Sequence, residues 1–237
     1  MPHAPVAATE REIVPAAAPD TKTSDVVPTD VTESPTVPLA VPTNGVTALL
    51  AKDKLIVRDM MRMEGFTDAE IDARMDAVLA RYLEHLRVAL ADPARRAQLL
   101  PGVGPLIDAV EAADDLVLGL LTGNVVEGAR AKLAAVDLAF DRFALGAYGS
   151  DHEDRSQLPP VALARAQALL GRALAGDRLV IIGDTPADVH CGRGVGARAI
   201  AVATGGYSVE ELDSHAPAAT FADLRDTARV LEAIRDA

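Results

Sequence analysis

Residues 179–188 limit the possible folds of this chain more than any other stretch. Residues 179–182 read Leu-Val-Ile-Ile, which is typical of a strand buried on both faces of a parallel sheet. Gly183 and Asp184 follow this run. Pro186 suits the first turn of a helix because its φ is fixed and it has no N–H to pair. A strand that leads directly into a helix predicts an α/β fold.

The two carboxylates of this stretch, Asp184 and Asp188, are four residues apart. Open α/β sheets bind ligands at the carboxyl ends of their strands, so both are expected at a ligand site. Neighbouring carboxylates repel each other unless a cation lies between them, and Mg²⁺ is the cation we expect. The structural alternative is that Asp184 caps the helix and Asp188 lies on the surface.

Composition excludes several classes of function. The 237 residues carry a net charge of −12 and no basic stripe, which argues against nucleic acid or an anionic membrane as partner. A single cysteine excludes an internal disulfide framework and fits a reducing compartment. No apolar run approaches the length of about 18 residues that a membrane span needs, and no secretory signal is recognisable. We therefore expect a cytoplasmic protein, monomeric or homodimeric.

The chain divides into three regions. Residues 1–43 are rich in Pro, Ala and Thr, and the spacing of the prolines predicts a disordered tail. Residues 44–101 show helical periodicity without a strand, with helices expected from Asp53 to Glu64, behind the capping box Thr67–Glu70, and from Asp92 to Leu100. Residues 102–237 alternate between helix and strand.

This alternation predicts a Rossmann-like, doubly wound parallel sheet with right-handed crossovers. The strands are expected at residues 116–121, 143–148, 179–182 and 199–203. The helices are expected at residues 103–113, 126–136, 159–172, 187–192, 208–212 and 224–235.

Polar groups follow the ends of these strands. Thr122, Gly123 and Asn124 follow one strand, and a hydroxyl beside backbone N–H groups is what a phosphoryl oxygen needs. The loop after the next strand ends at Arg155, which could neutralise a phosphoryl group. The alternatives are that Thr122 caps the next helix, and that Arg155 pairs with Asp151, Glu153 or Asp154.

The order of these motifs resembles the haloacid dehalogenase (HAD) superfamily, in its phosphoglycolate-phosphatase-like branch with a helical cap. The resemblance rests on Leu-Leu-Thr-Gly-Asn at 120–124, Arg155 before Leu-Pro-Pro, and Gly-Asp-Thr-Pro-Ala-Asp at 183–188. It implies that Thr122, with Gly123 and Asn124, binds phosphate and that Arg155 replaces the usual lysine. It further implies that Asp184 binds Mg²⁺, with Asp188 supporting the metal directly or through water. Residues 44–101 would be the cap.

The chain departs from the family at its first motif. The family begins with a central strand ending in Asp-x-Asp, whose first Asp attacks phosphorus and whose second is the general acid/base, and no such motif precedes the cap. The nearest look-alike, residues 41–46, has Pro42 and Asn44 where the carboxylates belong. The nucleophile strand is therefore expected to be missing. The tail would then supply a poor substitute, the protein would be unstable, or residues 1–43 are not the native reading frame.

Two functions follow from these motifs. The first is a Mg²⁺-dependent phosphatase for a small phosphorylated metabolite, such as phosphoglycolate or a sugar phosphate. The second is a catalytically inactive HAD-like protein that keeps a phosphate or Mg²⁺ pocket for binding or regulation. Another doubly wound phosphate binder, such as a receiver domain, would not explain the cap-like helices.

Overall fold

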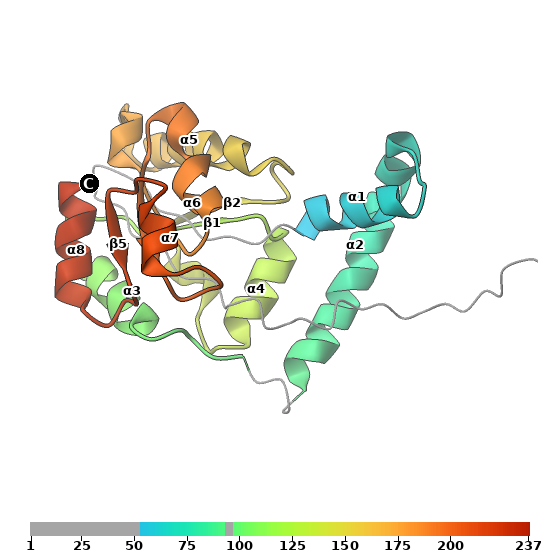
Figure 1. The fold of residues 1–237 in the computed structure, drawn as a ribbon. Helices are drawn as coiled ribbons and strands as arrows, with labels where there is room; N and C mark the ends of the chain where they lie inside the picture. Colours follow the sequence, from blue (N-terminus) through green and yellow to red (C-terminus); the bar gives the residue numbers. More distant parts are fainter. Residues whose placement is uncertain (1–52, 93–96) are drawn as a thin grey trace, which may run out of the picture.

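The computed structural model describes residues 53–92 and 97–237 (Figure 1). The predictions for residues 1–43 and for the lead-in to the cap before Asp53 lie outside these residues, as does the look-alike at 41–46. The helices are α1 (Asp53–Met63), α2 (Asp68–Ala91), α3 (Val103–Glu111), α4 (Val126–Ala134), α5 (Leu158–Leu170), α6 (Pro186–Cys191), α7 (Val209–Asp213) and α8 (Thr227–Asp236). The strands are β1 (Gly119–Thr122), β2 (Leu145–Tyr148), β3 (Val180–Gly183), β4 (Arg198–Val202) and β5 (Ala219–Phe221).

Helices α1 and α2 pack together at one end of the molecule, away from α8 at the other (Figure 1). The predicted capping box is present: Thr67 accepts from the N–H of Glu70, and the Glu70 carboxylate accepts from the N–H of Thr67. Behind it, Ile71, Met75 and Leu79 recur at helical spacing and form a small buried cluster. This pair is the described helical part of the predicted cap, whose boundaries stay a prediction.

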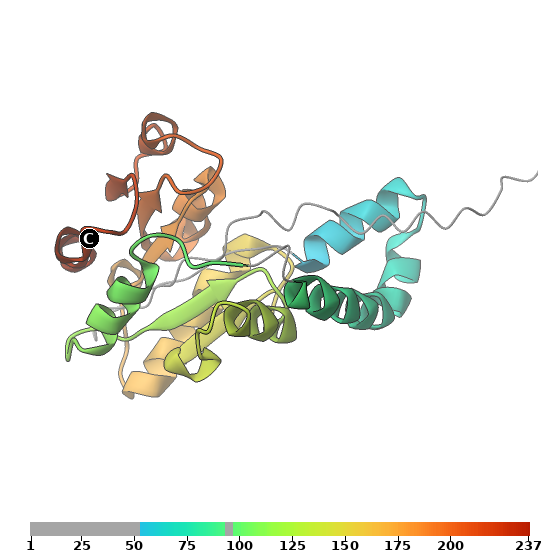
Figure 2. The ribbon, with the colours of Figure 1, turned by 90° about the horizontal axis from the view of Figure 1, so that it is seen from below.

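The strands form two parallel sheets, as the alternation of helices and strands predicts. β1 pairs with β2, and the second sheet has the order β3-β4-β5. Helices cover both faces. α3, α4 and α8 contribute to one core cluster and α5 and α6 to the other. In Figure 1, α5 lies above β1 and β2 and α4 lies below them, and Figure 2, seen from below, again shows α1 and α2 at the end opposite α8. The doubly wound α/β fold is therefore confirmed.

Strands β1 and β3 supply side chains to the same two clusters. Leu120 and Ile182 face the first cluster, whereas Leu121 and Ile181 face the second. The alternation is the same in both strands because successive side chains of a strand point to opposite faces. The two sheets are thus halves of one layer between shared hydrophobic faces.

Hydrogen bonds fix the ends of β1 against its surroundings. The carbonyls of Leu118 and Asn124 accept from Ala144 and Gly149 on the β2 side, at 3.0 and 2.9 Å. The carbonyl of Gly123, just beyond β1, accepts from the N–H of Asp53 at 3.1 Å and lies so close to Gly149 that a Cβ there would collide with it. Among the described residues, β1 pairs with no strand other than β2, and the prediction that the central strand is missing concerns residues outside the described part.

The structure corrects two details of the sequence prediction. Residues 97–100 are not helical, so the helix expected to reach Leu100 is wrong there, while residues 93–96 lie outside the described part. Leu99 and Leu100 instead pack against the core from an irregular segment. β5 was not predicted, because its three residues are only half-buried and too short to show a pattern.

None of the helices in the described ranges is long and apolar enough to cross a bilayer.

Candidate functional site

The end of β3 carries a buried ion pair between Arg155 and Asp188. The Oδ1 atom of Asp188 accepts a hydrogen bond from Nη2 of Arg155. The Oδ2 atom accepts from the backbone N–H and the hydroxyl of Thr185, at 3.0 and 2.9 Å. The side chain of Asp188 is 2% exposed and that of Arg155 is 11% exposed. Asp188 thus holds Arg155 at the carboxyl edge of the sheet.

Local sequence explains this arrangement. Thr185 is the N-cap of α6 and Asp188 is its third residue, so the two side chains complete a reciprocal capping box. Pro186 occupies the first turn, as predicted. The alternatives for Asp184 and Asp188 are therefore both wrong: Thr185 is the cap, and Asp188 is buried.

Burial lowers the pKa of Arg155 without removing its charge at neutral pH. Desolvation lowers the pKa of Arg155 to about 9, and the nearby Cys191 and Asp184 oppose this shift. The guanidinium is therefore still positively charged at neutral pH. Its Nε atom is buried and has no hydrogen-bond partner among the described residues. A buried cation of this kind at a strand end is suited to an anionic group.

Asp184 lies beside the loop that follows β4. A side chain on Gly205 would collide with the Asp184 carboxylate, so glycine allows the two loops to approach closely. Thr204, in the same loop, has a buried hydroxyl without a partner among the described residues. The sequence motifs assign no role to Thr204.

The described carboxylates do not by themselves form a Mg²⁺ site. Asp188 already accepts three hydrogen bonds from Arg155 and Thr185, so Asp184 is the better candidate for a direct ligand, and the support of a metal by Asp188 stays a prediction. In residues 53–92 and 97–237, no group of three or more His, Cys, Asp or Glu residues is placed to hold a metal ion. A complete set of metal ligands would need donors beyond these two carboxylates.

The end of β1 carries a second polar group, centred on Thr122. The Thr122 hydroxyl oxygen accepts from the backbone N–H of Asn124 at 3.1 Å and from its side-chain Nδ2 at 2.7 Å. Nζ of Lys132 donates to Oδ1 of Asn124 at 2.6 Å. Thr122 and Asn124 are almost fully buried. The N-cap of α4 is Val125, so the alternative that Thr122 caps this helix is wrong.

Asp53 connects this group to α1. Its Oδ2 accepts from the N–H of Val125 at 3.0 Å, and its Oδ1 accepts from the hydroxyl of Tyr82 at 2.9 Å. The residue is 7% exposed, and its Oδ1 lies 3.9 Å from Nζ of Lys132. A buried carboxylate is stable at this position because donors and a cation surround it.

The loop before Arg155 is held by other ion pairs. Glu153 binds Nε and Nη2 of Arg58 at 2.6 and 2.8 Å, and Asp151 binds Arg165. Asp154 caps the turn that carries Arg155 by accepting from the N–H of Ser156. Arg155 pairs with none of these acids, so that alternative for Arg155 is wrong in this structure.

Arg155 and Asp188 are in direct contact, and the charge of Asp184 acts on Arg155. Thr122, Gly123 and Asn124 form a separate group at the carboxyl end of the other sheet. Sequence reasoning missed Lys132, Asp53 and Arg58. For Asp53, the only available signal was an acidic residue at the first position of an expected helix.

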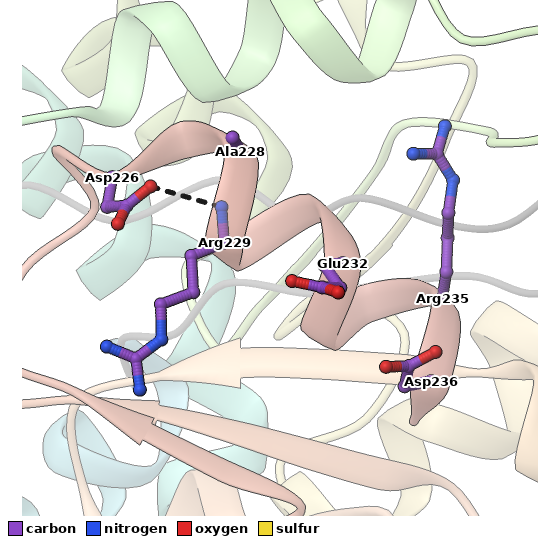
Figure 3. Close-up of a pocket in the computed structure, with 6 residues that line it drawn as sticks. All are labelled: Asp226, Ala228, Arg229, Glu232, Arg235 and Asp236. Carbon is purple, nitrogen blue, oxygen red and sulfur yellow. Dashed lines mark hydrogen bonds between the residues drawn. The ribbon is translucent and has the colours of Figure 1, made fainter.

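A surface hollow of about 600 Å³ lies apart from this site. It runs along α8 and is lined by charged side chains, among them Arg229, Glu232 and Arg235 (Figure 3). All its described lining residues belong to α8 or to its N-cap. None of them is a residue that the sequence motifs predict to be functional.

Comparisons with known proteins agree with the motif order. A family model of HAD-hydrolase-like proteins matches residues 156–227. The chain is 31% identical over 159 residues to a phosphoglycolate phosphatase of Rhodospirillum rubrum, covering 67% of this chain and 62% of that relative. The chain therefore spans less than two thirds of the length of this relative.

Solved structures share the fold. A hydrolase from Pseudomonas syringae has a TM-score of 0.53 and 20% identity, covering 76% of this chain and 78% of that one. A β-phosphoglucomutase from Clostridium difficile has a TM-score of 0.54 and 13% identity, covering 77% of each chain. The Gly-Asp-Thr-Pro-Ala-Asp motif lies within the residues that the family model matches. With its motif order, its doubly wound fold and these matches, the chain is similar to the hydrolases of the haloacid dehalogenase superfamily.

Proposed function

We propose that the protein is a phosphatase that hydrolyses a small phosphate monoester, of the phosphoglycolate or sugar phosphate type. Its partner would be a small phosphorylated metabolite in the cytoplasm. The protein itself would act as a monomer or a homodimer. Mg²⁺ is the cofactor that the family resemblance implies. The similarity to a phosphoglycolate phosphatase supports the substrate class, since the name of that relative states its activity.

The buried pairing of Arg155 with Asp188 is the observation that carries this proposal. A guanidinium held at the carboxyl edge of a parallel sheet supplies a fixed positive charge where such folds bind ligands. Phosphoryl transfer depends mainly on positioning and charge stabilisation, which fixed donors provide without reorganisation. Asp188 fixes Arg155, and the family's order of motifs implies that Thr122 serves the same site.

The roles of the individual side chains follow from their chemistry. Arg155 would stabilise charge on the phosphoryl oxygens, and Thr122 would donate a hydrogen bond to one of them. Asp184 would be a ligand of Mg²⁺, which when bound neutralises charge on the phosphoryl group. Gly123 would offer its backbone N–H to a phosphoryl oxygen, and Asn124, whose backbone N–H and Nδ2 both donate to Thr122, would hold the Thr122 hydroxyl at the phosphate.

The proposal assigns the attacking group to no residue. The resemblance implies attack by an aspartate on phosphorus, followed by hydrolysis of the phosphoaspartate by water. The sequence contains no Asp-x-Asp motif. The matches do not support the inactive HAD-like alternative, and an activity assay separates it from the phosphatase.

The test is hydrolysis of p-nitrophenyl phosphate by the full chain with and without Mg²⁺. We expect turnover that requires Mg²⁺ and falls by about 100-fold or more in Asp184→Ala, since removing one charge-stabilising group typically costs that much. Asp177→Ala is the control, because Asp177 belongs to the turn before β3 and lies outside the motifs. Absence of turnover in a folded wild-type chain would contradict the proposal.

A further inference from the structure

We propose that Asp53, Lys132 and Asn124 form a hydrogen-bonded and ionic chain that fixes the Thr122 hydroxyl as a donor and links this orientation to the position of α1. This chain of contacts runs from the first residue of α1, through α4, to the end of β1. The role of these contacts in binding phosphate rests on the proposed function, whereas the contacts themselves do not. Asn124, Lys132 and Asp53 are positioning residues in this proposal.

The hydrogen bonds that the Thr122 hydroxyl accepts leave it to act as a donor. A threonine hydroxyl has two acceptor positions and one donor hydrogen. Both acceptor positions are used by Asn124, through its backbone N–H at 3.1 Å and its Nδ2 at 2.7 Å. The O–H hydrogen is therefore left to donate, and a phosphoryl oxygen is an acceptor that suits it.

Lys132 fixes the direction of the Asn124 side chain. An asparagine amide can be reversed, which exchanges its donor and acceptor ends. A lysine ammonium only donates, so at 2.6 Å it requires the oxygen Oδ1 to face it. Nδ2 must then face Thr122, as observed. Without Lys132 the amide could reverse, and the acceptor position of Thr122 filled by Nδ2 would be free.

Asp53 ties this arrangement to α1. Its carboxylate oxygens bind the Val125 N–H and the Tyr82 hydroxyl, and Oδ1 lies 3.9 Å from Nζ of Lys132. Its backbone N–H binds the carbonyl of Gly123 at 3.1 Å. Asp53 is thus attached on both sides of Asn124. A shift of α1 would remove the carboxylate from Lys132 and change the position of the ammonium relative to Asn124.

The two side-chain N–H signals of Asn124 in an NMR spectrum of the full chain report on this arrangement directly. We expect Lys132→Met to move both signals and Lys132→Arg, which keeps the charge, to restore them in large part. Lys132→Gln is the second variant if the methionine variant does not fold. Asp53→Asn should move the same signals, while Asp59→Asn, a matched change of an exposed acid on α1, should not.

Binding of inorganic phosphate gives the functional readout. We expect the dissociation constant for phosphate to rise about tenfold in Lys132→Met, the effect of losing one hydrogen bond to a charged group. It should change little in Asp59→Asn. Unchanged Asn124 signals in the Lys132 variants, or an Asp53→Asn effect confined to Val125, would overturn the inference. If the wild type neither binds phosphate nor hydrolyses an aryl phosphate while the signals still move, the proposed function fails and the chain of contacts stands.

Discussion

At the scale of single residues, the ion pair of Arg155 and Asp188 dominates the described site. Two charges that are largely removed from water are stable only while they compensate each other. The Thr185 donors occupy the second oxygen of Asp188, so the carboxylate has few other positions available. The pair therefore acts as a fixed unit, in which a change to either member exposes the other to the full cost of burial.

Asp188→Asn should accordingly destabilise the fold. The substitution leaves the Arg155 charge buried without its partner, which typically costs roughly 3 kcal/mol or more. Urea unfolding at neutral pH measures this change in the free energy of unfolding. Asp177→Asn, in the turn before β3, is the control. A loss below about 0.5 kcal/mol, the range of ordinary surface substitutions, would show that water compensates Arg155.

The sequence predicted the residues of the motifs better than the residues that orient them. Thr122, Arg155, Asp184 and Asp188 follow strand ends, so local pattern was sufficient to find them. Asp53 binds Val125, which lies 72 residues away in the sequence. No local pattern encodes a contact of that separation, and Lys132 similarly resembled an ordinary helix-surface lysine.

At the scale of elements, periodicity and capping chemistry predicted most helices and strands. Helix α2 begins directly behind its predicted capping box at Thr67, and α6 begins at Pro186, one residue before its predicted start. Prediction failed where tertiary contacts decide the conformation. Leu99 and Leu100 pack on the core from an irregular segment, and β5 is defined by its pairing with β4 rather than by its own sequence.

The start of α3 likewise depends on a tertiary contact, which is made at Gly102. Gly102 has a φ of +87°, and a Cβ at this position would collide with the backbone of Leu224, in the segment that precedes α8. We expect Gly102→Ala to lower the midpoint of thermal unfolding by several degrees, or to prevent folding. Gly104→Ala in α3 is the matched control, because open space surrounds it and alanine favours helix. Equal midpoints for the two variants would contradict this view.

At the scale of the whole molecule, Arg58 joins the α1–α2 pair to the loop that carries Arg155. It lies on α1 and binds Asp72 on α2 as well as Glu153 in the loop. Its side chain is 13% exposed, so these contacts are only partly screened by solvent. The bound Arg58 lowers the pKa of Glu153 below its ordinary value. The ionised form of Glu153 is therefore the one that stabilises the docked helices.

This contact predicts a pH-dependent difference between the wild type and Arg58→Gln. A lowered pKa in the folded state means that the stabilisation is present above the ordinary glutamate pKa of about 4.3 and is lost as the pH falls through the folded value. The wild type should therefore be the more stable protein at pH 7, with the difference shrinking below about pH 4. Urea unfolding across this range measures it. Arg87→Gln, on the exposed surface of α2, should show no such trend.

The overall architecture was predictable from the alternation of elements. A parallel layer needs strands buried on both faces, and β1 and β3 have that composition. The shared clusters on either side of the two sheets could not be predicted, because they depend on which helices face each other. Those contacts are properties of the folded chain.

The reactivity of Cys191 can report on local opening around Arg155 and Asp188. It is the single cysteine of the sequence, it is 6% exposed, and its thiol donates to the backbone carbonyl of Asp188. Burial raises the pKa of Cys191, so the reactive thiolate is scarce while the corner stays closed. The rate at which a thiol reagent labels the native protein therefore measures how often the surroundings of Arg155 and Asp188 open. The kinetics of thiol labelling can therefore measure local opening around Arg155 and Asp188 in the wild-type protein, without an introduced cysteine.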